Sequence, residues 1–208
     1  MEQKVIITIE RQHGSDGEKI GKLLAERLGI SFFDREILAE ASRESNIGEE
    51  VFQTFDEVCV NAGIYSMVQD VRVAKAGMGE YKQPPAELIY LAEFNAIRKL
   101  AKEHSGVFIG RCSDYVLWEY TNAIHFFIYA PIDVRVERVC QHEKLAWSDA
   151  EIIVCKKDKE REKYYNYYAN RKWGDMCNYN LSIDTGRIGL DEAVSILEKY
   201  VKSIGKII

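Results

Sequence analysis

The first 28 residues contain a strand pattern, a glycine-containing turn and a helix pattern in direct succession. Residues 4–9 are mostly β-branched and predict a buried strand, and residues 11–17, RQHGSDG, predict a turn. Apolar residues then recur at helical spacing from Ile20 to Leu28. This order favours an α/β fold, and the amide groups at the start of such a helix can bind an anion.

The rest of the chain continues the alternation of strand and helix patterns. Strands are predicted at residues 30–34, 106–109, 125–130 and 179–184, and helices from about residue 35, after the Pro84-Pro85 pair, after Pro131 and over residues 190–201. Several strands are continuous apolar runs, which indicates a parallel sheet with helices on both faces, in three layers. Ligands of such sheets bind beyond the carboxyl ends of the strands.

Length and charge limit the classes of function. A chain of 208 residues, 47% hydrophobic, can form one domain with a single core. The formal net charge of −5 argues against binding to nucleic acid or to an anionic membrane, because neutralising phosphates requires a surplus of Lys and Arg.

The cysteines and histidines show no metal-site spacing. Five widely spaced cysteines without a C-x-x-C pair are interpreted as reduced thiols, and four histidines without H-x-x-x-H spacing give no support for a metal site built by the protein. The chain shows neither a signal-peptide pattern nor a membrane span, so we expect a cytoplasmic protein.

The glycine turn differs from the P-loop pattern G-x-x-x-x-G-K-[ST]. When the helices are aligned, Gly17 stands at the position of the lysine and Glu18 at that of the hydroxyl residue. Asp16 adds a carboxylate that would repel a polyphosphate unless Lys19 or Mg²⁺ intervenes. The alternative is an ordinary turn between strand and helix.

The chain as a whole resembles the cytidylate kinase-like family. The resemblance rests on ordered matches along the sequence: Arg11 with Gly14-Ser15 and Gly17, residues 33–37 (FDREI), Gly110-Arg111 with Asp114-Tyr115, residues 127–131 followed by Arg135 and Arg138, Asp158-Lys159-Glu160-Arg161, Trp173-Gly174-Asp175, and residues 178–185. It implies a P-loop nucleoside-monophosphate-kinase fold, ATP with Mg²⁺, and a nucleoside monophosphate. We expect one domain, 1–208, with a core of about 1–41, 101–139 and 179–208, a helical acceptor-binding insert at 42–100 and a lid at 140–178.

The resemblance also implies a set of site residues. The donor phosphates would be bound by Gly14, Ser15, Asp16, Gly17, Glu18 and Lys19, and the acceptor by Asp34, Arg35, Gly110, Arg111 and Asp114. The catalytic residues would be Arg11, Arg135, Arg138 and Arg161 around the transferred group, with Asp158 as the partner of Arg161. Structural alternatives stay open: a helix cap for Asp34, an ion pair with Asp114 for Arg111, a local salt bridge for Arg11, and solvated helix faces for the lid arginines.

Three hypotheses for the function follow. The first is transfer of the ATP γ-phosphoryl group to CMP or dCMP; the second is nucleotide binding with little turnover, because the lysine and hydroxyl are missing. The third is a kinase of another small phosphate acceptor, whose pocket would involve Met67, Met78 and Tyr81. A homodimer is a further expectation.

Overall fold

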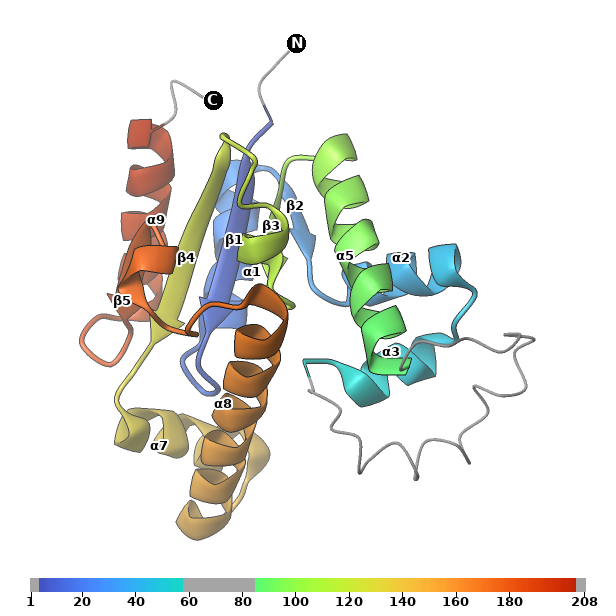
Figure 1. The fold of residues 1–208 in the computed structure, drawn as a ribbon. Helices are drawn as coiled ribbons and strands as arrows, with labels where there is room; N and C mark the ends of the chain where they lie inside the picture. Colours follow the sequence, from blue (N-terminus) through green and yellow to red (C-terminus); the bar gives the residue numbers. More distant parts are fainter. Residues whose placement is uncertain (1–3, 58–84, 205–208) are drawn as a thin grey trace.

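The computed structural model describes residues 4–57 and 85–204. A five-stranded, all-parallel sheet with the order β2-β3-β1-β4-β5 forms its centre (Figure 1). The strands are β1 (Ile6–Arg11), β2 (Ser31–Phe33), β3 (Gly106–Ile109), β4 (Ala123–Tyr129) and β5 (Leu181–Asp184). All their carboxyl ends therefore lie at the same edge.

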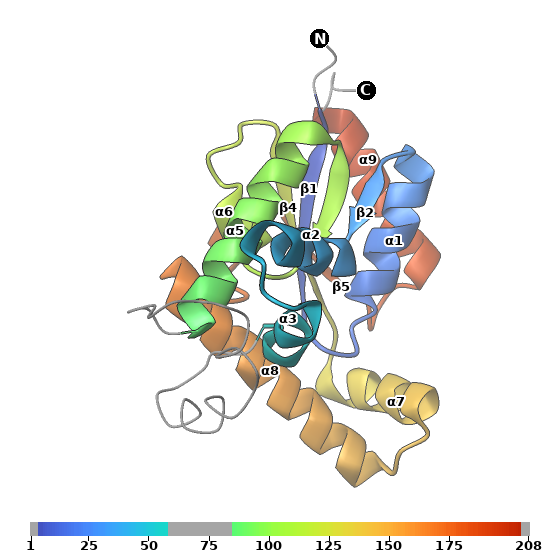
Figure 2. The same cartoon turned by 90° about the vertical axis from the view of Figure 1, so that its right-hand side faces the viewer.

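Helices cover both faces of the sheet and its carboxyl edge. The helices are α1 (Gly17–Leu28), α2 (Arg35–Ser45), α3 (Glu49–Phe55), α5 (Pro85–Glu103), α6 (Ser113–Val116), α7 (Ile132–Glu143), α8 (Trp147–Ala169) and α9 (Leu190–Ile204), with a 3₁₀ turn η2 (Met176–Asn178). Helices α1 and α9 pack on one face and α2 and α5 on the other, while α7 and α8 lie beyond the carboxyl edge (Figure 2).

Alternation of side chains along the strands produces the two cores. Ile7 and Ile9 are fully buried against Ile20 and Leu24 of α1, whereas Ile6 points to the opposite face and joins the cluster formed by α2 and α5. Burial of each such side chain stabilises the fold by about 1.5–3 kcal/mol. The predicted α/β fold with helices on both faces is confirmed.

Element boundaries agree with the sequence patterns to within a few residues. Helix α1 ends at the predicted Gly29, which has a left-handed φ of 64° and donates its N–H to the carbonyls of Ala25 and Glu26. Helix α2 begins at Arg35, as expected. Met67, Met78 and Tyr81 lie outside the described residues.

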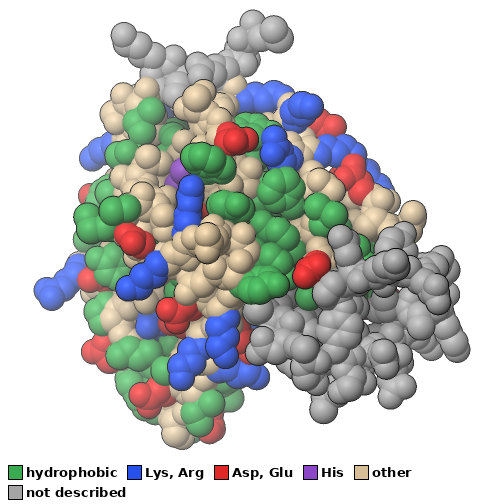
Figure 3. All heavy atoms as spheres, in the orientation of Figure 1, with side chains coloured by type: hydrophobic (Ala, Val, Ile, Leu, Met, Phe, Trp, Pro, Cys, Tyr) green, Lys and Arg blue, Asp and Glu red, His purple; other side chains and the backbone are tan. Residues whose placement is uncertain are grey.

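The surface carries charges of both signs. Basic and acidic side chains are interspersed on the face seen in Figure 3, without a large patch of one sign. None of the helices within residues 4–57 and 85–204 is long and apolar enough to cross a membrane.

Candidate active site

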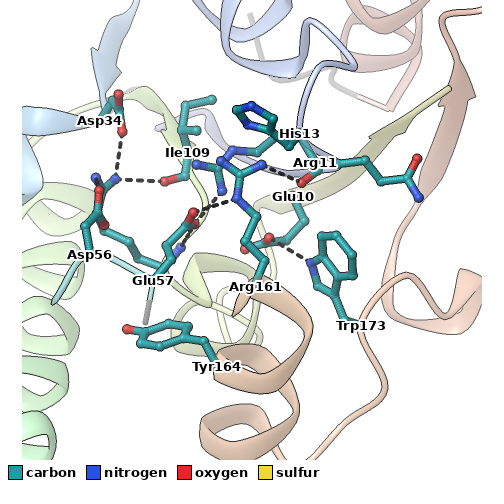
Figure 4. A network of polar contacts seen from close by, with 12 residues as sticks. Glu10, Arg11, His13, Asp34, Asp56, Glu57, Ile109, Arg161, Tyr164 and Trp173 are labelled. Carbon is teal, nitrogen blue, oxygen red and sulfur yellow. Dashed lines mark hydrogen bonds and ion pairs between the residues drawn. The ribbon is translucent and has the colours of Figure 1, made fainter. Parts of the chain in front are cut away.

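Three predicted side chains meet at the carboxyl edge of the sheet. Arg11 ends β1, Asp34 follows β2, and Arg111 follows β3. The Arg111 guanidinium is almost fully buried and donates to Asp34 Oδ1 at 2.8 Å, to Asp56 Oδ2 at 2.8 Å and to the Ile109 carbonyl at 3.1 Å (Figure 4). Arg111 is thus paired with Asp34 rather than with Asp114, and the Asp34 side chain does not cap α2.

A cleft of about 430 Å³ opens beside this network. We name it the acceptor cleft, and its lining includes six of the predicted site residues: Arg11, Glu18, Asp34, Arg35, Arg111 and Arg161. Gly110 and Asp114 are not in its lining. Asp114 is buried, and its Oδ2 accepts a hydrogen bond from the Tyr165 hydroxyl at 2.6 Å.

A second pocket, of about 300 Å³, surrounds the glycine loop. This loop pocket is lined by Gly14, Asp16, Gly17, Glu18 and Lys19, all predicted, together with Arg138. The first hydrogen bond of α1 runs from the Ile20 N–H to the Asp16 carbonyl. The N–H groups of residues 17–19 precede it, so they have no carbonyl partner within the helix. The pocket therefore combines free amides with the positive end of the helix dipole, which suits an anion.

The loop pocket and the acceptor cleft adjoin each other. Arg11, His13, Glu18 and Arg161 line both of them. Burial and the nearby charge of Arg161 lower the pKa of His13 to about 4, so its imidazole is neutral at pH 7. The two arginines consequently supply the positive charge at the junction.

Arg135 and Asp158 fix the loop from outside both pockets. Arg135 Nη1 donates to the His13 carbonyl at 3.1 Å and to Asp158 Oδ2 at 2.5 Å, and Asp158 Oδ1 accepts from the His13 N–H at 2.8 Å. Asp158 thus pairs with Arg135, whereas Arg161 has another partner. These contacts join α7 and α8 to the backbone of the loop.

Arg138 and Lys19 compensate the additional carboxylate of the loop. Asp16 Oδ1 lies 2.7 Å from Lys19 Nζ, and Asp16 Oδ2 lies 3.3 Å from Arg138 Nε. Arg138 also donates to Thr185 Oγ1 at 2.9 Å and to the Thr185 carbonyl at 2.7 Å. Ser15 is buried outside both pockets, and its hydroxyl donates to the Gln12 carbonyl. The carboxylate of Asp16 therefore faces two cations in this loop.

Sequence reasoning missed Glu57, which follows α3. Its carboxylate accepts hydrogen bonds from Arg11 Nη1, from Arg161 Nε at 2.9 Å and from the Arg111 N–H at 3.0 Å (Figure 4). Burial tends to raise the pKa of this carboxyl, but Arg11 and Arg161 outweigh burial and hold the pKa well below its ordinary value. No local pattern identifies Glu57, because its partners are 46 to 104 residues away.

Gly110 leaves the space for this ion pair. Gly110 has a φ of 64°, and a Cβ at this position would collide with Glu57 Oε1 and Arg11 Nη1. The close approach of the Glu57 and Arg11 side chains to the backbone of Gly110 thus explains why a glycine is needed at this position.

Two buried carboxyls, Glu10 and Glu93, lie near the same network. Burial raises the pKa of Glu10 to about 8, with further contributions from Asp114 and Glu57, and burial likewise raises the pKa of Glu93 to about 8. Glu93 Oε2 accepts from the Tyr164 hydroxyl at 2.8 Å. Both carboxyls are therefore protonated at neutral pH in the folded protein.

These raised pKa values predict a loss of stability as the pH rises from 6.5 to 8. Unfolding lets Glu93 ionise, so the unfolded state binds fewer protons in this range and the free energy of unfolding falls with pH. His13 and His125, whose pKa values are lowered to about 4, are neutral in the folded protein above pH 6.5. In the unfolded state their pKa is about 6.5, so the protons that they still bind just above pH 6.5 offset part of this trend.

The variant Glu93→Gln tests this prediction, because it keeps an acceptor for Tyr164 and removes the ionisable group. Relative to the wild type, its free energy of unfolding should rise by about 2 kcal/mol between pH 6.5 and pH 8. Urea titrations at both pH values measure the change, and the exposed Glu103→Gln on the same helix is the control. Equal pH slopes for Glu93→Gln and the wild type would contradict the raised pKa.

Carboxylates for a divalent ion are spread rather than clustered. Among the residues that the structure describes, no group of three or more His, Cys, Asp or Glu side chains is arranged to hold a metal ion. Glu18 lies at the junction of the two pockets, and its carboxylate oxygens are of the type that Mg²⁺ prefers.

Comparison with known proteins identifies relatives along most of the chain. The model of the cytidylate kinase-like family matches residues 6–187. A cytidylate kinase of Methanothrix thermoacetophila is 27% identical over 183 residues, which cover 88% of this chain and 90% of that protein. A cytidylate kinase of Methanosarcina barkeri is 24% identical over 201 residues, which cover 95% and 97% of the two chains.

Solved structures with the same fold include one uncharacterized protein and several kinases. The protein from Eubacterium ventriosum superimposes with a TM-score of 0.72 at 28% identity, covering 96% of this chain and 99% of the other. A shikimate kinase from Bacteroides thetaiotaomicron gives a TM-score of 0.55 at 13% identity, covering 95% and 98%. These likenesses confirm the predicted α/β fold of the P-loop nucleoside-monophosphate-kinase type.

Proposed function

Because the chain belongs to the cytidylate kinase-like family, we propose that it transfers the γ-phosphoryl group of ATP to a nucleoside monophosphate, with CMP and dCMP as the favoured acceptors. The observation that carries this proposal is the pair of adjoining pockets. They share Arg11 and Arg161, so a donor in one pocket and an acceptor in the other would meet between two guanidinium groups.

In this proposal the loop pocket binds the phosphates of ATP. The amides of the first turn of α1 would donate to the β- and γ-phosphate oxygens, in the place of the missing lysine side chain. Arg135, Asp158 and Arg138 would keep the loop in position through its carbonyls and the His13 N–H. Bound Mg²⁺ would neutralise part of the phosphate charge.

The acceptor cleft would hold the monophosphate. Arg111 and Arg35 suit its phosphate, and the Asp34 carboxylate suits a sugar hydroxyl or an amino group. One acceptor phosphate oxygen would then attack the γ-phosphorus in line as ADP leaves, with Arg11 and Arg161 stabilising the charge that spreads over the transferred oxygens.

A second candidate function is nucleotide binding without efficient turnover. Two features favour it: the loop lacks both the lysine and the hydroxyl residue of a P-loop, and the arginines at the junction are already paired with Glu57. A binding protein of this kind would retain affinity for MgATP but form no ADP in response to an acceptor.

ADP formation from MgATP distinguishes the two functions. We would measure it with a panel of nucleoside monophosphates and of non-nucleotide phosphates, and measure MgATP binding by calorimetry in parallel. Turnover stimulated by CMP or dCMP supports the proposed kinase. Stimulation by a non-nucleotide phosphate alone would change the acceptor class, and binding without stimulation by any acceptor would favour the second function.

A further inference from the structure

The side chains at the junction of the two pockets depend on one buried carboxylate. The Glu57 carboxylate accepts hydrogen bonds from Arg11 of β1, from Arg161 of α8 and from the Arg111 N–H, which follows β3. Of the described residues, Arg11 and Arg161 are the two arginines that line both pockets. A single carboxylate thus contacts every guanidinium group that would face both substrates.

Charge explains why a carboxylate is needed at this point. Burial lowers the pKa of Arg161, and the neighbouring positive charge of Arg11 lowers it further, while Glu57 opposes both effects. Two guanidinium groups that are buried and close together repel each other unless an anion lies between them. Glu57 therefore allows Arg11 and Arg161 to occupy the junction together before any phosphate is bound.

The backbone is arranged to bring Glu57 to this place. Glu57 has a left-handed φ of 55°, a conformation that costs a residue with a side chain about 1–2 kcal/mol. Gly110 provides the open space over which the Glu57 carboxylate and the Arg11 guanidinium meet. The left-handed conformation of Glu57 and the lack of a side chain at Gly110 therefore both permit the contact between Glu57 and Arg11.

We propose that Glu57 is the positioning residue that aligns Arg11 and Arg161 for transfer of the phosphoryl group. The inference rests on the proposed function. Because Glu57 acts on guanidinium groups that meet the transferred group, its loss should lower kcat more than it weakens nucleotide binding, which the loop amides would still supply.

The variants Glu57→Gln and Glu40→Gln test the role. Glu40 is a matched control: its carboxylate is also buried and paired with two cations, Arg43 and Lys99, but it lies outside both pockets. Glu57→Gln should lower kcat about 100-fold with the KM for MgATP within about threefold of the wild type. Without nucleotide, it should also speed amide hydrogen exchange in α8 around Arg161. Glu40→Gln should change neither property.

Three outcomes would overturn the inference: an unchanged kcat in Glu57→Gln, a KM for MgATP that rises as much as kcat falls, or the same effects in Glu40→Gln. If the wild-type protein shows no acceptor-stimulated turnover, the proposed function fails and hydrogen exchange alone decides about Glu57. Unchanged exchange around Arg161 in Glu57→Gln would then show that Glu57 does not position this arginine.

Discussion

Replacing Arg111 with alanine is expected to lower the free energy of unfolding by about 3–5 kcal/mol and to abolish turnover with any phosphate acceptor. The Arg111 side chain is 1% exposed and pairs with Asp34 and Asp56, so its removal leaves two carboxylates without their shared cation. Burial raises the pKa of Asp56 even with Arg111 present, which indicates how strongly that carboxylate depends on a cation.

Urea unfolding and acceptor-stimulated ADP formation measure the two effects. The variant Arg111→Lys separates them, because it retains the charge but cannot donate to Asp34 and Asp56 as a planar fork; it should recover part of the stability and little of the turnover. Arg98→Ala, on the exposed side of α5, is the control and should behave like the wild type. A stable Arg111→Ala protein with normal turnover would remove Arg111 from the site.

The fold was predictable because its determining patterns are local. A strand, a glycine turn and an amphipathic helix each depend on neighbouring residues, and their alternation along the chain indicates a parallel sheet. The boundary of β1 was less predictable: the pattern ended the strand at Ile9, whereas pairing with β4 continues through Glu10 and Arg11. Polar residues interrupt an apolar pattern, but their backbone still forms the ladder of a sheet.

The site was predictable only where the topology determines it. Arg11, Asp34 and Arg111 follow three strands whose carboxyl ends meet at one edge, so their convergence follows from the fold class. The role predicted for each of them stays a prediction that the variants must test.

The ion-pair partners of the site residues were less predictable from the sequence than the positions of these residues in the fold. Asp158 pairs with Arg135 rather than with Arg161, the partner predicted from the sequence, and Arg161 pairs with Glu57. Glu57 lies outside every recognisable pattern. Partner choice among many buried charges depends on tertiary distances, which the spacing of residues in a sequence does not contain.

A large effect on kcat, without the loss of stability expected for Arg111→Ala, is expected from a change at Arg11. Arg11→Ala should lower kcat for acceptor-stimulated ADP formation by about 10²–10³-fold, the cost of removing one preorganised donor from the reacting group. Arg11 lies at the end of the central strand β1, lines both pockets, and is held by Glu57. Its substitution should exceed the effect of Glu57→Gln, because the positioning carboxylate acts only through the arginines that it aligns.

A surface arginine on α1 provides the comparison for Arg11. Arg27 pairs with Asp191 and Glu198 of α9 and lies outside both pockets, so Arg27→Ala should retain the kinetic constants of the wild type. If Arg11→Ala retained kcat and lost only affinity for MgATP, Arg11 would be a binding residue and the free amides of the loop would carry the transfer. If Arg11→Ala matched Arg27→Ala in every constant, the junction between the pockets would not be the place of reaction.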